Sequence, residues 1–223
     1  MQRFFDFVLA LIALILLFPM LLITAILLRF TGEGEILFRQ TRLGRNQNNF
    51  DLLKFATMLK DSPNMGTGTI TIKDDPRVLP MGRFLRYTKI NELPQLWNVL
   101  VGDMSLVGPR PLTRQTFSMY TLEGQSIISK VRPGLSGLGS VVFRAEEKIL
   151  SDAGSGEAIY KNHVAPYKEK LELWYCSNAS FSLYVRLIIM TVLVVVFSDK
   201  VNIERMLPMI PPMPEDLRRM IVT

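Results

Sequence analysis

The chain has 223 residues, which is enough for one folded domain with an appendage and too few for two domains of ordinary size. Its 26 Lys and Arg outnumber the 20 Asp and Glu, and the net charge of +6 indicates an anionic partner: nucleic acid, acidic lipid headgroups or a phosphorylated substrate. One cysteine and one histidine exclude an intramolecular disulfide framework and a Cys/His zinc site, so we expect a reducing compartment and oxygen ligands for any metal.

The first predicted element is an apolar segment near the amino terminus. Residues Phe7 to Leu28 are 22 consecutive uncharged, mostly apolar residues, and a helix that rises about 1.5 Å per residue can cross a bilayer over that length. A signal peptide fits poorly, because its apolar region usually has about 7 to 15 residues and ends at a small-residue cleavage site. Pro19 lies within the segment and removes a backbone hydrogen bond, so we expect a kink near it.

Basic residues flank this segment on both sides, with Arg3 before it and Arg29 after it. Positive charge is retained on the cytoplasmic side of a membrane, so charge at both ends suits a re-entrant helix that enters and leaves by one face. A kinked helix that crosses the membrane is the simpler alternative, because transmembrane helices tolerate proline. The residues alone favour the crossing helix and leave the re-entrant one open.

The middle of the chain alternates short apolar stretches with turns. Residues 35–38 predict a strand, a basic loop rich in Gly and Asn follows, and an apolar stretch covers 50–58, before a turn-rich region at 61–82. Apolar residues then recur at helical spacing from Leu93 to Leu100. Asn91 is placed to be the N-cap of that helix.

The carboxyl-terminal third holds three predicted elements. Residues 146–173 are charged and predict a helix that is broken at 154–156 and at Pro166. The apolar run 187–197 has only eleven residues, too few to cross a membrane, and predicts either a core element or a helix that lies at the membrane interface. Four prolines between 207 and 214 indicate an extended arm.

A basic block between residues 75 and 111 carries the candidate chemistry. Glu92 lies in the first turn of a predicted helix, where free N–H groups and the helix dipole favour phosphate. Arginine forks match phosphate oxygens, and prolines on both sides of Arg110 stiffen its backbone. A diphosphate bridged by Mg²⁺ on Glu92 fits this set. Taken singly, these residues also fit structural roles as a helix cap, a first-turn acid and a headgroup-facing surface.

Ordered motifs extend beyond this block. They are the apolar segment with Pro19, Leu53-Lys54-Phe55-Ala56-Thr57-Met58, Asn91-Glu92-Leu93-Pro94-Gln95-Leu96-Trp97-Asn98-Val99, Gly102 to Pro111, Val131-Arg132-Pro133-Gly134-Leu135-Ser136-Gly137-Leu138 and Leu173-Trp174-Tyr175. This set, which covers nearly the whole chain, closely resembles the small monotopic phosphoglycosyl transferases of the bacterial sugar transferase family.

The resemblance implies a fold and a location. We expect a mainly helical α+β structure, with a re-entrant membrane helix (1–30), a compact catalytic domain on the membrane surface (31–200) and a proline-rich arm (201–223). The family lies on the cytoplasmic face of the bacterial inner membrane. Membrane lipid is then a partner and nucleic acid is not, while a homo-oligomer stays open.

The resemblance also implies an activity. Members transfer a sugar 1-phosphate from a UDP-sugar to undecaprenyl (polyprenyl) phosphate and release UMP, the first membrane step in the synthesis of capsule, exopolysaccharide or another glycoconjugate. A carboxylate attacks the sugar-linked phosphate, and the phosphosugar enzyme then reacts with the lipid phosphate. Mg²⁺ on the adjacent Glu neutralises the charge that develops on the phosphoryl oxygens.

The expected site follows from the matching positions. Asn91 and Glu92 are the candidate catalytic residues, and Glu92 is also the candidate metal ligand. The candidate phosphate-binding residues are Lys54, Arg83, Arg86 and Arg110, and the candidate pocket residues are Asp75, Pro109, Pro111 and Arg132.

Asn91 departs from the family pattern, because the nucleophilic Asp of the family falls at this position. An uncharged carboxamide is a poor nucleophile toward phosphorus. Three explanations stay open: an inactivated chain that binds UDP-sugar or polyprenyl phosphate as a regulator, another acid such as Glu92 as nucleophile, or direct transfer without a covalent intermediate. The sequence favours the last two, because the other site positions are retained.

Overall fold

The computed structural model describes residues 1–66, 74–144, 156–197 and 203–222. The helices are α1 Gln2–Arg29, α2 Pro80–Tyr87, α3 Gln95–Val101, α4 Arg114–Phe117, α5 Leu122–Ile128, α6 Leu138–Val142, α8 Gly156–Ile159, α9 Ala165–Asn178, α10 Phe181–Phe197, α11 Ile203–Met206 and α12 Glu215–Val222. The strands are β1 Leu37–Leu43, β2 Asn49–Phe55, β3 Ser105–Val107 and β4 Gly134–Ser136. The described part of the chain is therefore a mainly helical α+β structure, as predicted.

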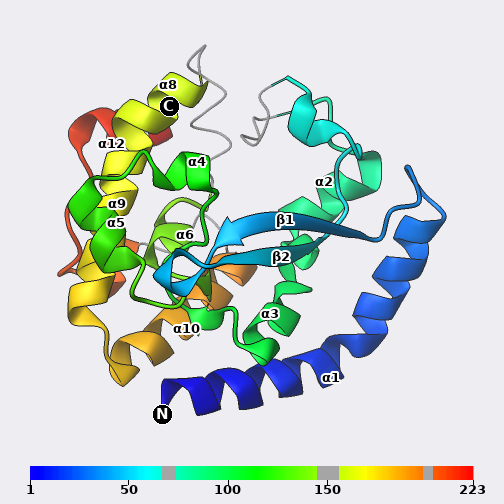
Figure 1. Ribbon diagram of the computed structural model, residues 1–223, viewed down its shortest axis with the longest axis horizontal. Coiled ribbons are helices and arrows are strands. Elements are labelled where there is room, and N and C mark those ends of the chain that lie inside the picture. Colours follow the sequence, from blue (N-terminus) through cyan, green and yellow to red (C-terminus); the bar gives the residue numbers. More distant parts are fainter. Residues whose placement is uncertain (67–73, 145–155, 198–202, 223) are drawn as a thin grey trace.

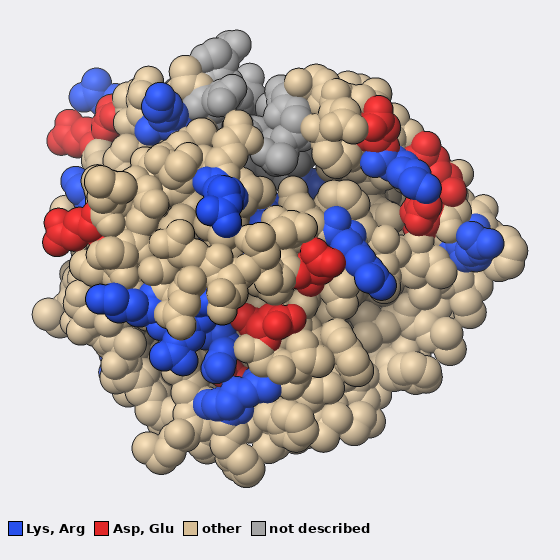
Figure 2. Space-filling model, in the orientation of Figure 1, with Lys and Arg blue, Asp and Glu red and all other residues tan. Residues whose placement is uncertain are grey.

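Helix α1 is unbroken over 28 residues and contains Pro19. Figure 1 shows it running along the lower edge of the molecule and then turning up its right side, so the predicted bend is present. Within the described ranges it is the one helix long and apolar enough to cross a membrane. Its outer face exposes apolar side chains such as Ile15, Leu16 and Phe18. The lower margin of the molecule, where α1 lies, is mostly uncharged in Figure 2.

The inner face of α1 packs on the rest of the chain over most of its length. Ala10 is fully buried in a cluster with Leu96 and Val99 of α3, and Leu28 is buried in a second cluster with Phe55 of β2. Polar contacts hold the amino end in place. The Asp6 carboxylate accepts hydrogen bonds from Ser105, from the Leu106 N–H and from Tyr184, and Arg3 donates to the backbone carbonyls of α3.

Two two-stranded sheets frame the site. Strands β1 and β2 are antiparallel, with Leu37 paired to Phe55 and Leu43 to Asn49. The predicted strand at 35–38 was therefore placed too early, because pairing with β2 extends the strand through the basic residues up to Leu43. Strands β3 and β4 are parallel and join the motif at 102–111 to the motif at 131–138.

The largest core cluster lies among α4, α5, α6, α9, α10 and α12 (Figure 1). Tyr167 and Leu171 of α9 and Leu187 of α10 are almost completely buried in it. The residues after 206 also reach this cluster, because Leu207 and Leu217 are buried there. The segment 207–214 contains no helix or strand, has a turn at 208–210 and packs on the core through Leu207 and Ile210, and α12 follows it.

Two helix boundaries differ from the prediction. Pro166 does not break a helix, because it occupies the first turn of α9, where no N–H donor is required, and a π-helical segment, Tyr160–Val164, precedes it. The predicted break at 154–156 falls almost entirely outside the described residues. Helix α10 begins at Phe181, well before the apolar run at 187–197, and its buried face makes it a core element.

Asn91 is not an N-cap, contrary to the prediction. Lys89 adopts a left-handed backbone conformation, a 3₁₀ turn covers Ile90–Glu92, and α3 begins only at Gln95 without a side-chain cap. Asn91 therefore lies inside the 3₁₀ turn with 4 % of its surface exposed. Its side chain makes no capping hydrogen bond to the first N–H groups of α3.

Candidate active site

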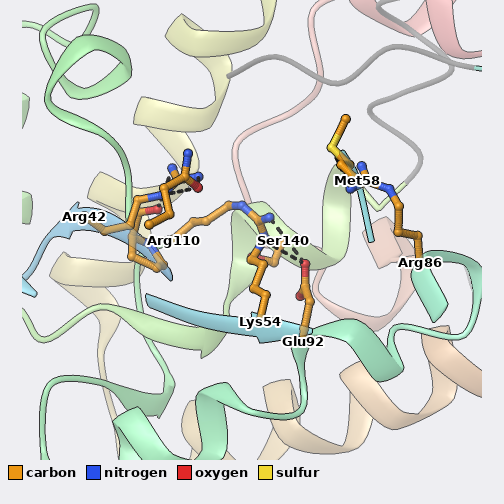
Figure 3. A network of polar contacts seen from close by, with 9 residues as sticks. Arg42, Lys54, Met58, Arg86, Glu92, Arg110 and Ser140 are labelled. Atoms are coloured by element: carbon orange, nitrogen blue, oxygen red, sulfur yellow. Dashed lines mark hydrogen bonds and ion pairs between the residues drawn. The ribbon is translucent and has the colours of Figure 1, made fainter. Parts of the chain in front are cut away.

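A cavity of about 810 Å³ opens between the β1–β2 hairpin, the 3₁₀ turn at 90–92, the loop after β3, α6 and α10. Its polar lining gathers most of the basic residues that the sequence singled out. Figure 3 shows Lys54 and Arg110 directed toward Glu92, while Arg86 is directed toward Met58. The predicted site residues that line the cavity are Lys54, Arg86, Asn91, Glu92 and Arg110, and Arg42 and Ser140 are among the other polar residues of the lining.

Glu92 forms the centre of the polar region. Its Oε1 lies 3.5 Å from the Lys54 Nζ and 3.7 Å from an Arg110 guanidinium nitrogen. The two basic side chains approach the carboxylate from β2 and from the loop after β3, as Figure 3 shows. One carboxylate is thus shared by two cations, so this part of the cavity carries an excess of positive charge.

Asn98 fixes the relative position of β2 and the segment that carries Glu92. Its side-chain oxygen accepts from the Leu53 N–H at 3.0 Å, and its side-chain nitrogen donates to the Asp51 carbonyl at 2.9 Å. These two bonds lock the first turns of α3 to the strand that carries Lys54. The motif residues at 91–99 therefore place Glu92 as well as forming a helix.

Close backbone packing positions Arg110. A Cβ on Gly137 would lie 2.0 Å from the Gly108 carbonyl oxygen, so no side chain fits between the two loops there. The Arg110 N–H donates to the buried Glu172 Oε1 at 3.3 Å, and its guanidinium lies 3.5 Å from the Ser140 hydroxyl. The glycines of the two motifs and Glu172 therefore hold the Arg110 backbone against the cavity.

The charges in the cavity shift one another's pKa values. Burial alone would raise the pKa of Glu92, but Lys54, Arg110 and Lys89 together lower it to about 2, so the carboxylate is ionised. Burial lowers the pKa of Lys54 to about 8 and that of Arg42 to about 10, and in each case neighbouring cations add to the effect. Binding of an anion such as a diphosphate would reduce the electrostatic repulsion among these crowded cations.

Asn91 lines the same cavity, and its Oδ1 is buried without a hydrogen-bond partner among the described residues. A buried acceptor with no partner costs about 1–3 kcal/mol. An oxygen ligand for a cation, or an acceptor for a substrate hydroxyl, would remove this cost. The position is thus suited to contact a substrate, whichever of Asn or Asp occupies it.

The donor set around Glu92 fits a magnesium ion that arrives with a diphosphate. Mg²⁺ commonly takes one or two protein oxygens and several from substrate phosphates or water. Glu92 and the unpartnered Asn91 Oδ1 supply this number from adjacent residues. The described residues contain no group of three or more acidic or imidazole side chains, so they do not form a metal cage of their own.

The structure separates the remaining candidates from the cavity. Arg83 is exposed on α2, and only its helix neighbour Arg86 lines the cavity. Arg132 lies on the loop before β4, outside the lining. Pro109 and Pro111 are buried on both sides of Arg110, so they shape its loop without lining the cavity.

Asp75 is also outside the cavity and belongs to a buried ion pair. Its carboxylate lies 2.6 Å from the Arg77 guanidinium, and Arg77 also donates to the carbonyls of Ser62 and Met65. These bonds join residues 62–65 to the segment that precedes α2. The motif position therefore has a structural role.

Replacing Asp75 by Ala is expected to lower the free energy of unfolding by about 3–5 kcal/mol, because it leaves the Arg77 charge buried without its carboxylate. Urea unfolding in detergent measures the loss. The matched control is Glu35→Ala, which breaks the exposed pair with Lys60 and should cost much less. Equal losses in the two variants would contradict the structural role.

Sequence reasoning did not find Arg42, which lines the cavity, or Glu172, which accepts a hydrogen bond from the Arg110 N–H. Arg42 donates to Gln40 and to the Pro111 carbonyl, and it brings β1 into the site. Burial raises the pKa of Glu172 to about 7, and one of its oxygens has no partner among the described residues. The available signal was the position of Glu172 between Leu171 and Leu173, since Glu is rarely buried without a function or a partner.

Comparison with known proteins gives the family of the chain. The model of the family described as bacterial sugar transferase matches residues 1–198. The chain belongs to the bacterial sugar transferase family. This confirms the family expected from the motifs.

Individual relatives are consistent with the family. This sugar transferase is 33 % identical over 202 residues to the uncharacterized sugar transferase EpsL of Bacillus subtilis, covering 91 % of this chain and 90 % of EpsL. It is 32 % identical over 202 residues to the undecaprenyl-phosphate glucose phosphotransferase of Komagataeibacter xylinus, covering 88 % of this chain and 36 % of that protein. It is 38 % identical over 143 residues to the UDP-glucose:undecaprenyl-phosphate glucose-1-phosphate transferase of Escherichia coli, covering 63 % and 31 %.

The sugar transferase therefore spans only about a third of the length of two of these relatives, and nearly all of the third. Those with a specific name are described as transferases, so the alternative of an inactive regulator gains no support from them.

Proposed function

We propose that this chain transfers a sugar 1-phosphate from a UDP-sugar to undecaprenyl phosphate and releases UMP. The observation that carries the proposal is the convergence of Lys54, Arg86 and Arg110 on one cavity with Glu92 at its centre. Two relatives are named for this reaction with glucose, and another for the reaction with N-acetylgalactosamine. The reaction begins the membrane stage of exopolysaccharide or glycoconjugate synthesis.

The cavity residues have different roles in the proposed phosphoryl transfer. Lys54, Arg86 and Arg110 bind the diphosphate of the donor and offset the charge on its oxygens as the bond to UMP breaks. Bound Mg²⁺ would supply further charge neutralisation between the phosphates, held by Glu92 and the Asn91 amide oxygen. Glu172 and the glycine contacts keep Arg110 in place during the step.

The uncharged side chain at Asn91 favours direct transfer. An oxygen of undecaprenyl phosphate attacks the sugar-linked phosphorus of the UDP-sugar, the bond from that phosphorus to the bridging oxygen breaks, and UMP leaves with the electron pair. No bond to the enzyme forms in this route. Asn91 then contacts the substrate or the metal ion through its buried oxygen.

We also propose that α1 is re-entrant and that the catalytic part lies on the cytoplasmic face of the bacterial inner membrane. Both ends of α1 contact the same folded unit: Asp6 binds β3 and α10, and Leu28 packs against Phe55 and Leu85. A helix that crossed the bilayer would separate its ends by about 30 Å of hydrocarbon. The exposed apolar residues on the outer face of α1 suit insertion into one leaflet.

This topology predicts that a cysteine inserted after Met1 and a cysteine at position 30 both react only after the inner membrane is opened. Phe30 is exposed, so Phe30→Cys should be accessible to an impermeant maleimide, and Cys176→Ser removes the background thiol. Labelling of whole cells and of inverted vesicles measures the difference. Reaction of either site in cells with only a permeable outer membrane would contradict the re-entrant helix.

The proposed activity is tested by UMP release. Purified protein is mixed with a panel of UDP-sugars and Mg²⁺, with and without undecaprenyl phosphate. At least one UDP-sugar should yield UMP in proportion to the lipid supplied. Release of UDP in place of UMP, or no nucleotide from any donor, would contradict the proposal.

A further inference from the structure

The cavity has two chemically different sides. One side carries the charged groups around Glu92. Helix α10 lines another part of the cavity with Ile188, Val192 and Val195, which recur at i, i+4 and i+7 and form an apolar wall, and with Thr191 and Val194. A UDP-sugar and its metal ion can bind to the charged groups, but they offer no apolar group that would contact the wall.

The wall is held rigidly. Another face of α10 is buried in the main core through Leu187 and Met190. The Thr191 hydroxyl is hydrogen-bonded to Ser136 of β4 at 2.6 Å, which fixes the rotation of the helix next to the Arg110 loop. The apolar side chains therefore keep their orientation toward the cavity.

The wall also opens to the outside of the protein. Val192 is 57 % exposed and Val195 is 41 % exposed, although both line the cavity. Helix α10 thus presents to the cavity apolar side chains that also reach the protein exterior. An amphiphile could place its anionic head on the cations near Glu92 and its long apolar chain along the wall.

We propose that the α10 wall, Ile188, Val192 and Val195, binds the first isoprene units of the polyprenyl phosphate, with the lipid phosphate on the cations of the cavity. The inference rests on the proposed function, because it assigns the acceptor of that reaction to one wall of the same cavity. Burial of apolar surface drives the binding of the chain, and the cations select a phosphate head over a neutral alcohol. The donor occupies the charged side beside it, so both substrates reach one reacting phosphorus.

The double variant Val192→Asn/Val195→Asn tests the wall. Polar amides in contact with the isoprenoid chain should raise the KM for undecaprenyl phosphate by about tenfold or more, while the KM for the UDP-sugar changes less than about twofold. The matched control is Val185→Asn/Ile189→Asn on the same helix. Both residues are exposed and do not line the cavity, so the KM for the lipid should stay close to that of the unmodified chain.

Two outcomes of this comparison would overturn the inference. A raised KM for the UDP-sugar with an unchanged KM for the lipid would assign the wall to the donor. An equal increase in the lipid KM for both double variants would show a general contact of α10 with the membrane.

A second measurement does not depend on turnover. The full chain in lipid nanodiscs is irradiated with a polyprenyl phosphate that carries a diazirine near its phosphate end. Adducts should map to residues 181–197, and undecaprenyl phosphate should displace them where undecaprenol does not. Competed labelling of α10 without UMP release would defeat the proposed function alone, and UMP release without labelling of α10 would defeat this inference alone.

Discussion

Replacing Asn91 by Asp should change donor-only UMP release from none to about one UMP per protein molecule. The new carboxylate can attack the sugar-linked phosphorus, form a bond to it and expel UMP, which is the covalent step of nucleophilic catalysis. Without acceptor lipid the phosphosugar stays on residue 91 and the reaction stops after one turnover. Rapid-quench measurement of UMP gives the burst, and intact mass gives the added sugar phosphate.

The unmodified chain is the control for this experiment. It should release UMP only when undecaprenyl phosphate is present and should carry no adduct. Asn and Asp have nearly the same shape, so the circular dichroism spectrum and melting temperature of the variant should show that it is folded. A burst from the unmodified chain would contradict direct transfer and make Glu92 the first nucleophile to test.

Loss of Glu92 or Arg110 is expected to have the largest effect on turnover. Glu92→Gln removes the carboxylate that Lys54 and Arg110 share, and Arg110→Ala removes the guanidinium that we propose binds the transferred phosphoryl group. Removal of a single preorganised group that stabilises developing charge typically costs about 10²–10³ in kcat. In each variant, the rate of UMP release with lipid present should therefore fall by at least about that factor.

Two further variants sharpen this prediction. Arg110→Lys should also be poor, because a single ammonium does not reproduce a bidentate fork. Arg83→Ala is the matched control, since this arginine belongs to the same sequence motif but is exposed outside the cavity. Similar losses for Arg83→Ala and Arg110→Ala would contradict the position of the site.

Local sequence signals predicted some elements well and others poorly. The apolar run around Pro19 was enough to predict α1 and its bend, because length, hydropathy and a missing N–H act locally. The extent of β1 depends on pairing with β2, and the conformation of Asn91 depends on the left-handed Lys89. Neither of these is encoded in the residues 35–38 or 91–100 alone.

The sequence likewise predicted some residues of the candidate site and not others. The family resemblance placed Lys54, Glu92 and Arg110 together, and the structure brings them within ion-pair distance. It also grouped Asp75 with them, although this residue is paired to Arg77 elsewhere. The contact of Glu172 with Arg110 and the α10 residues in the cavity lining come from parts of the chain far from the motifs, so only the packing of α9 and α10 reveals them.

The most direct test of sugar 1-phosphate transfer follows the phosphorus atom itself. A UDP-sugar labelled with ³²P in its sugar-linked phosphate is incubated with the protein, Mg²⁺ and undecaprenyl phosphate, and the lipid and aqueous phases are separated. The label should enter the lipid phase in a one-to-one ratio with unlabelled UMP in the aqueous phase. Label that stays in the aqueous phase as UDP while the sugar enters the lipid phase would contradict phosphoryl transfer.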